Sequence, residues 1–460
     1  MKETVVTQFI WNGEVNTAWY NGTAIEFTIN TAEELAGFAK LVTSENDFAG
    51  KSIKLGTHIA LNDTTDLKNW ETSPPANAWT PIGKPFSNGF MGTFDGNGYT
   101  ISGVYINSTE DNQSLFEHIG NYGIIKNLGV VASYVKGGNI VGGLIGYNDG
   151  GTIINSYFNG TVAGGTLVGG FVGANGGKIS DSYFSGTIKG TQKNVGGFAG
   201  NNYGTISKSY STGTVIGTDY AGGLVGEDTK GSIDNCYSAS KVAGTDNVGG
   251  LVGLDFKGSV NNSYSTGAVT GTGKNVGGLV GCNDNTTINS SYSASKVAGM
   301  DYVGGLVGGN LKGTVSNSYS TGVVVGKSCV GGLIGDNIGN LTAQALTSSV
   351  ANPKGMVSNS YSIGLVKGEK NVGGLIGSNG HHAVTFGDKI TSIAPVGKVI
   401  NSYYNKDTSG QIETDKGMPK YTTQMKRADT YTDWDFTQIW GLNDTINNGY
   451  PHLLTNHKKY

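Results

Sequence analysis

The chain has 460 residues with a formal net charge of −3, and only 14% of its residues are charged. It therefore lacks the basic surface that nucleic-acid binding requires, and no apolar run approaches the roughly 20 residues of a membrane-spanning helix. Glycine accounts for 77 residues, but not at every third position as in collagen. These features predict neither a nucleic-acid partner nor a membrane span.

The first 60 residues carry no repeat and are expected to form an N-terminal cap. Thr31 is followed three residues later by Glu34, which is the pattern of a capping box, and apolar residues then recur at helical spacing. This predicts a short helix near 32–43. Residues 61–140 are expected to form irregular first rungs. Their Asp-Gly-Asn-Gly segment lacks the ligand spacing of an EF-hand loop, so we predict a tight turn and no metal there.

A repeat organises the rest of the chain. The sequence Val-Gly-Gly-Leu-Ile-Gly at 141–146 recurs eight more times, seven times at intervals of 26 to 28 residues and once after 42. Each copy is followed by an Ile/Val-x-Asn-Ser-Tyr piece and mostly by a short Thr-Val-x-Gly piece, all too short for helices. A fixed period of this length is typical of a solenoid. We predict an all-β fold, a single-chain parallel and right-handed β-helix of nine repeats over 141–404.

Two residue types recur at fixed positions and predict ladders along the stacked turns. Stacking places each residue about 4.8 Å from its copy, so that asparagine amides can bond from turn to turn. We also expect these asparagines to adopt the left-handed backbone that Asn tolerates. The predicted amide ladder contains Asn148, Asn175, Asn202, Asn283, Asn310, Asn337 and Asn379, with Asp228 and Asp255 in the same column. The predicted tyrosine ladder contains Tyr157, Tyr183, Tyr210, Tyr237, Tyr264, Tyr292, Tyr319, Tyr361 and Tyr403.

The Gly-Gly segment allows two orientations of its apolar residues. In a flat strand Leu144 points away from Val141 and Ile145, which predicts an exposed apolar ladder that would serve as a partner surface. A bend at Gly-Gly would instead turn all three inward. The cysteines lie at three different phases of the repeat, so we predict three free thiols. Cys236 replaces the serine that precedes the ladder tyrosine, which indicates a tight, dry slot.

The last two repeats each carry an insertion, near 340–354 and 380–396, at the same phase of consecutive turns. Loops on a rigid scaffold often carry recognition, although these two could simply shield the end of the solenoid. The adjacent histidines are interpreted as surface residues, and neither a metal nor a cofactor is predicted. Residues 405–460, rich in aromatic residues, are expected to form a C-terminal cap. The candidate ligand-binding residues are Leu341, Gln344, His381, His382, Phe386, Asp388 and Lys389.

The nine Gly-Gly-Leu/Phe-x-Gly copies resemble the GLUG repeat of bacterial surface and secreted proteins, which include adhesin-like proteins and IgA-specific metallopeptidases. The resemblance covers roughly residues 20–454 and implies a parallel β-helix in a secreted or cell-surface protein. The start of the chain lacks the apolar core of a signal peptide, so we expect that an export signal has been removed. The sequence has no His-Glu-x-x-His motif, and the resemblance therefore does not extend peptidase activity to this chain.

Two functions remain open at this point. The first is a non-catalytic surface module, adhesin-like or structural, whose partner would be a glycan, a host or matrix protein, or another copy bound through exposed ladder faces. The alternative is a polysaccharide-binding or polysaccharide-degrading β-helix protein. Hydrolysis would require paired carboxylates on one face, and the acidic residues of the array are sparse and scattered.

Overall fold

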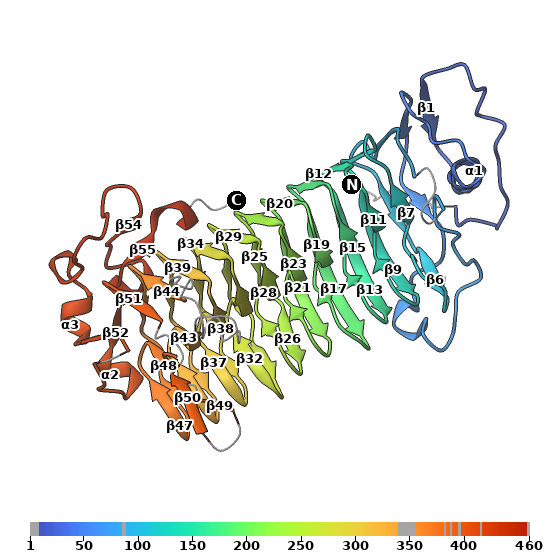
Figure 1. The fold of residues 1–460 in the computed structure, drawn as a ribbon. Helices are drawn as coiled ribbons and strands as arrows, with labels where there is room; N and C mark the ends of the chain where they lie inside the picture. The colour runs from blue at the N-terminus through green and yellow to red at the C-terminus, as the bar shows by residue number, and fades with distance from the viewer. Residues whose placement is uncertain are drawn as a thin grey trace. The chain divides into compact units, whose positions relative to one another are not determined.

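The computed structural model describes residues 9–84, 89–338, 355–380, 383–386, 389–393, 397–414 and 416–457, with the backbone alone over 383–386, 389–393 and 456–457. The chain divides into two compact units, Met1–Gly213 and Thr214–Tyr460. Strands of both units stack in successive parallel coils (Figure 1). The predicted all-β parallel solenoid is therefore confirmed.

Unit 1 builds each full coil from four strands. The back sheet contains β1 (Glu26–Ile29), β2 (Ser52–Leu55), β4 (Thr93–Asp95), β8 (Ile124–Lys126), β12 (Thr152–Ile154), β16 (Lys178–Ser180) and β20 (Thr205–Ser207). The tyrosine sheet contains β3 (Ile59–Ala60), β5 (Thr100–Ser102), β6 (Tyr105–Asn107), β9 (Gly129–Lys136), β13 (Tyr157–Gly164), β17 (Tyr183–Gly190) and β21 (Tyr210–Ile216), which contains the unit boundary. The corner strands are β10 (Val141–Gly142), β14 (Val168–Gly169) and β18 (Val195–Gly196). The amide sheet contains β7 (Phe116–Ile119), β11 (Ile145–Asn148), β15 (Val172–Asn175) and β19 (Ala199–Asn202).

Unit 2 repeats the same four-strand coil. Its back sheet contains β24 (Ser232–Asp234), β29 (Ser259–Asn261), β34 (Thr287–Asn289), β39 (Thr314–Ser316), β44 (Met356–Ser358) and β51 (Lys398–Ile400). Its corner strands are β22 (Ala221–Gly222), β27 (Val248–Gly249), β32 (Lys274–Gly277), β37 (Asp301–Gly304), β42 (Ser328–Gly331) and β47 (Lys370–Gly373). Its amide sheet contains β23 (Val225–Thr229), β28 (Val252–Phe256), β33 (Val280–Asp284), β38 (Val307–Leu311), β43 (Ile334–Ile338) and β48 (Ile376–Ser378).

The tyrosine sheet of unit 2 is split into two short segments per coil. The first segments are β25 (Tyr237–Ser238), β30 (Tyr264–Ser265), β35 (Tyr292–Ser293), β40 (Tyr319–Ser320), β45 (Tyr361–Ser362), β52 (Tyr403–Asn405) and β53 (Met418–Lys420). The second segments are β26 (Lys241–Gly244), β31 (Val269–Gly271), β36 (Val297–Ala298), β41 (Val324–Val325) and β46 (Val366–Lys367). The C-terminal region adds α2 (Lys406–Ser409), α3 (Thr422–Met425), β54 (Trp440–Gly441) and β55 (His452–Leu453), drawn in red in Figure 1.

The Gly-Gly segment forms a sharp corner between two strands. β10 ends at Gly142 and β11 begins at Ile145, so a coil of unit 1 has four strands and not the three predicted. A Cβ atom on Gly142 would lie 1.8 Å from the carbonyl oxygen of Ile145, which only glycine allows. Val141, Leu144 and Ile145 are all fully buried. The flat-strand prediction of an exposed apolar ladder is therefore wrong, and the bend at Gly-Gly is confirmed.

The N-terminal helix follows the sequence signal closely. α1 spans Ala32–Thr43, and the side-chain oxygen of its N-cap Thr31 accepts a hydrogen bond from the backbone N–H of Glu34 at 3.2 Å. The Glu34 carboxylate in turn accepts from the backbone N–H of Asn30 at 2.7 Å, one residue earlier than in a regular capping box. The helix buries its apolar face, including Leu35 and Phe38, within unit 1.

Candidate functional site

The asparagine column runs through the interior of both units. Asn148 donates its amide N–H to the side-chain oxygen of Asn175 at 2.8 Å, and Asn175 donates to Asn202 at 2.8 Å. In unit 2 the chain of donors runs from Asn283 to Asn310, Asn337 and Asn379, at 2.7, 2.8 and 2.9 Å. These side chains are buried, and each hydrogen bond between two amide groups satisfies one donor and one acceptor that water cannot reach.

The left-handed backbone does not belong to this inward column, so that part of the prediction is wrong. It occurs at the residue two positions before each ladder tyrosine, most often asparagine, as at Asn155 (φ 47°) and Asn317 (φ 47°). It also occurs at the residue before each corner valine, as at Asn275 (φ 59°). The inward amides continue a strand, whereas the left-handed residues mark corners of the coil, where Asn is tolerated.

The tyrosine rings form stacks on the outside of the coils. Neighbouring ring centroids lie 4.8 to 5.1 Å apart with interplanar angles of 2 to 6°. Tyr157 and Tyr264 are half-buried, whereas Tyr361 is fully buried beneath the C-terminal region. The covering residues pack as one aromatic cluster, which we call the aromatic cap: Met425, Tyr431, Trp434, Trp440, Tyr450 and Leu453.

The three cysteines are free and buried, as the sequence predicts. Cys236 is 1% exposed in the serine slot beside the tyrosine ladder, and its thiol donates to the carbonyl oxygen of Asp234 at 3.3 Å. Burial, together with nearby carboxylates, raises the pKa of the Cys282 thiol to about 12. This thiol is therefore neutral and a poor nucleophile at physiological pH.

The insertions are described only in part. In the second, β49 (Ala383–Phe386) and β50 (Lys389–Ile393) form an antiparallel hairpin, drawn beside β47 in Figure 1. Phe386 pairs with Lys389 across this hairpin through the backbone. All seven candidate ligand-binding side chains lie outside the described part of the chain: Leu341, Gln344, His381, His382, Phe386, Asp388 and Lys389.

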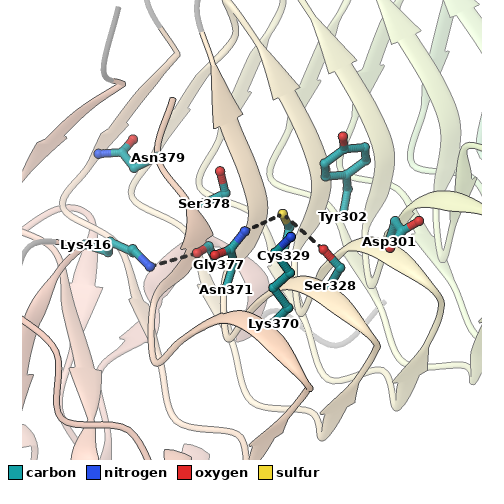
Figure 2. Close-up of a pocket in the computed structure, with 10 residues that line it drawn as sticks. All are labelled: Asp301, Tyr302, Ser328, Cys329, Lys370, Asn371, Gly377, Ser378, Asn379 and Lys416. Carbon is teal, nitrogen blue, oxygen red and sulfur yellow. Dashed lines mark hydrogen bonds between the residues drawn. The ribbon is translucent and has the colours of Figure 1, made fainter. Parts of the chain in front are cut away.

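A polar groove of about 560 Å³ opens in unit 2, and we call it the corner groove (Figure 2). Three of its residues, Tyr302, Cys329 and Asn371, precede the corner valine in three consecutive turns. All three have left-handed φ angles, of 55°, 52° and 52°. The groove is lined by Asp301, Tyr302, Ser328, Cys329, Lys370, Asn371, Gly377, Ser378, Asn379 and Lys416.

Hydrogen bonds and charge give the corner groove its chemistry. The Asn371 amide and the Ser328 hydroxyl both contact the Cys329 sulfur, at 3.6 and 3.7 Å. The Lys416 ammonium donates to the carbonyl oxygen of Gly377 at 3.0 Å (Figure 2). Burial raises the pKa of Tyr302, and the Asp336 carboxylate raises it further. The groove therefore offers neutral hydroxyl and amide groups, one carboxylate, two ammonium groups and one aromatic ring.

Of the residues in this groove, sequence reasoning assigned Asn379 to the amide ladder and Cys329 as a free thiol, and it related neither to a groove. The available signal was the residue before the corner valine. That position varies along the array: it is asparagine at Asn247, Asn275 and Asn371, but tyrosine at Tyr302 and cysteine at Cys329 in the turns between Asn275 and Asn371. Holding a non-glycine, non-asparagine residue in a left-handed backbone costs roughly 1–2 kcal/mol. No group of three or more His, Cys, Asp or Glu residues among the described residues could hold a metal ion.

Comparison with known protein families shows which repeat motif the chain carries. The GLUG motif matches residues 137–163, 164–189, 191–216 and 301–325. The chain is thus a repeat protein that carries GLUG motifs on a parallel β-solenoid. No helix in the described ranges is both long and apolar enough to cross a membrane.

Two relatives and one solved structure are similar to parts of the chain. A protein of Evansella cellulosilytica, provisionally named a Gly-rich membrane protein, is 47% identical over 58 residues, which cover 12% of this chain and 6% of that protein. Halomucin of Haloquadratum walsbyi is 36% identical over 104 residues, 22% of this chain and 1% of halomucin. The chain therefore spans a small part of both relatives. A Bacteroides ovatus structure, provisionally described as an immunoglobulin A1 protease, is 18% identical with a TM-score of 0.32, covering 94% of this chain and 92% of that one.

Proposed function

We propose that this chain is a non-catalytic module of a secreted or cell-surface protein, an adhesin-like scaffold that binds glycan in the corner groove. The observation that carries the proposal is the groove itself, where three turns present different side chains at one repeat position. An accessible tyrosine ring beside amide, hydroxyl and charged groups suits a sugar, because the ring packs on C–H surfaces and the polar groups bond its hydroxyls.

The surroundings of the groove support this assignment. Asn379 lines it, and Gly380, the next residue, begins the second insertion. A ligand in the groove would therefore lie at the base of the second insertion, on a scaffold held by the amide ladder. The names of the two relatives, a mucin-like name and a membrane-protein name, fit an extracellular setting for such a module. The repeat places most side chains identically in every turn, which suits a stalk more than an enzyme.

The test is a glycan-array and matrix-protein binding screen of the full chain and three variants. Tyr302→Ala combined with Lys370→Ala is expected to weaken binding about tenfold or more, which corresponds to about 1.4 kcal/mol. A second variant shortens 340–354 and 380–396 to the regular turn length and separates a loop contribution from that of the groove. Tyr220→Ala is the matched control, because Tyr220 holds the same repeat position and left-handed backbone outside the groove.

Each result has a distinct meaning. Equal binding by the wild type and the groove variant would reject the corner groove as the site. Binding lost only in the shortened variant would assign recognition to the insertions. No glycan bound by the wild type would reject glycan recognition, and release of reducing ends from a bound polysaccharide would reject the non-catalytic role.

A further inference from the structure

The inward column of unit 2 contains two carboxylic acids where the repeat otherwise has amides. Asp228 and Asp255 lie on β23 and β28, directly opposite each other in the parallel register, and Asp255 lies opposite Asn283 of β33. All three side chains are 0% exposed. A carboxylate in this column lacks the N–H groups with which each asparagine bonds the next turn.

A glycine lies beside each pair of neighbouring column side chains, and the distances from the position of an added Cβ atom show where the polar atoms of the pair lie. A Cβ atom on Gly313 would lie 2.0 Å from the Asn283 amide nitrogen and 2.4 Å from the Asn310 oxygen, two atoms that are hydrogen-bonded at 2.7 Å. A Cβ atom on Gly258 would lie 2.0 Å from Asp228 Oδ2 and 2.6 Å from Asp255 Oδ1. Asp228 Oδ2 therefore occupies the donor position, and Asp255 Oδ1 the acceptor position, of a ladder hydrogen bond.

Two ionised carboxylates cannot share such a site, because both charges would be desolvated and would repel each other. A carboxylic acid can replace an amide here, since its O–H donates where the N–H did. The side-chain oxygen of Asn283 is buried and receives no hydrogen bond in the described part of the chain. By the register, Asp255 is the neighbour that would supply that donor.

A third residue departs from the repeat at the same place. In unit 2 one position is the third residue after the column residue or, in the last two turns, the first residue after the insertion. This position is glycine in all turns except the turn of Asn283, where it is Thr286. Thr286 is 5% exposed and lies beside Asp255, where its hydroxyl lowers the pKa of the Asp255 carboxyl group. The one turn with threonine in place of glycine is therefore the turn beside the acid pair. Asp228, Asp255 and Thr286 thus depart from the repeat together, as one local arrangement.

We propose that Asp228 and Asp255 are held as protonated carboxyl groups at neutral pH and continue the amide ladder through O–H donors, so that unit 2 is stabilised by bound protons. Two protons complete the column: Asp228 donates to Asp255, and Asp255 donates to Asn283. The proton is the ligand of this site, and it is lost to solvent when the site opens.

The environment of the pair favours the neutral form. Burial raises the pKa of Asp255 well above its ordinary value, and the Asp228 carboxyl group raises it further, while bonds from Thr286 and the Gly258 backbone oppose the shift. The titratable groups that face Asp255 are Asp228 on β23 and Cys282 on β33, whose thiol is neutral.

The pH dependence follows from proton linkage. Because the folded pair holds protons more tightly than the unfolded chain, its contribution to stability is complete below the ordinary Asp pKa of about 3.9. It is lost as the pH rises from there through the folded pKa values. The unfolding equilibrium constant of the wild type should rise by up to about tenfold per pH unit for each proton. The double variant Asp228→Asn/Asp255→Asn restores amides and should lose this part of the pH dependence.

The experiment is urea unfolding of the full chain from pH 4 to pH 9, for the wild type, the double variant and the control Asp219→Asn, whose aspartate is exposed. We expect the double variant to unfold at a higher urea concentration than the wild type at pH 8, with a smaller difference at pH 4, and the control to follow the wild type. Equal pH slopes for the wild type and the double variant would overturn the proposal.

Two measurements keep the test decisive. The infrared C=O stretch of a protonated carboxylic acid is recorded at pH 7 in the Glu117→Gln background, because Glu117, with a pKa of about 7, contributes to the same band. Its absence in that background would overturn the proposal even if the double variant does not fold. Calcium and EDTA are then compared in the unfolding assay. Stabilisation of the wild type by calcium, lost in the double variant, would show that the oxygens hold a cation and would also overturn the proposal.

Discussion

The corner glycines give the strongest prediction about stability. Substituting Gly169 with alanine places a Cβ atom 1.9 Å from the carbonyl oxygen of Val172, 2.7 Å from the Gly200 nitrogen and 2.8 Å from the Phe198 oxygen. Cβ contacts below 3.0 Å essentially never occur, so the Val172 carbonyl must move by at least about 1.1 Å, the difference between 3.0 and 1.9 Å. All three neighbours are backbone atoms, which have no alternative rotamer.

The expected cost follows from what that movement disturbs. The Phe198 oxygen accepts hydrogen bonds from the backbone N–H groups of Phe171 and Val172, both at 2.9 Å, and each is worth roughly 0.5–1.5 kcal/mol. Overpacking a filled interior adds about 1–3 kcal/mol. Gly169→Ala should therefore lower the free energy of unfolding by about 2–6 kcal/mol.

Gly176→Ala is the matched control in the same unit. Gly176 is exposed, and an added Cβ atom would meet only the Asn148 carbonyl oxygen, at 3.1 Å, as a near neighbour. Its cost should lie within about 1 kcal/mol, because the lower entropy of the unfolded chain offsets a small adjustment. Urea midpoints followed by circular dichroism compare the two variants. Equal midpoints would refute the claim that the corner requires glycine for steric reasons.

Two further predictions concern single side chains. Burial raises the pKa of Glu117 to about 7 from an ordinary 4.5, so the stability that its bound proton contributes is complete below pH 4.5 and is lost as the pH rises to 7. The free energy of unfolding of Glu117→Gln should therefore rise by up to about 3 kcal/mol relative to that of the wild type between pH 5 and pH 8. A pH-independent difference between the urea midpoints of the two proteins would contradict this. Tyr361 donates its hydroxyl to the Pro451 carbonyl and accepts from the Asn447 amide at 2.6 Å, so Tyr361→Phe should cost about 1–2 kcal/mol, against less than about 0.5 for the half-buried Tyr264→Phe in the same denaturation assay.

Much of the fold could be predicted because a solenoid converts sequence period into spatial register. The positions of Asn310 and Tyr319 in their columns follow from the repeat length alone, since stacking places each copy above the last. The α1 boundaries were predictable for a different reason, because Thr31 and the apolar spacing are local signals. Neither inference requires knowledge of how distant segments approach one another.

Other features could not be predicted because they depend on the path of the backbone within a turn. The alternation of side chains along a strand holds only while the strand continues, and Gly143-Leu144 interrupts it. For the same reason the left-handed backbone was assigned to Asn148 when it belongs to Asn155. The corner groove combines Tyr302 with Lys416, residues that are far apart in sequence, and no local pattern relates them. The predicted ligand-binding residues of the insertions lie outside the described residues and stay predictions.

The departures from the repeat are where a specific function can be sought in such a protein. A side chain that recurs in every turn, such as the ladder tyrosine, cannot by its identity alone mark one location. Tyr302 and Cys329 occupy a strained backbone position where neighbouring turns have asparagine, and Thr286 replaces glycine beside the acid pair. Each replacement gives up a residue that suits the coil, so the replacement must be compensated by local contacts or by a ligand. The groove and the acid pair can therefore be tested separately, because they lie at different positions of the coil and involve different residues.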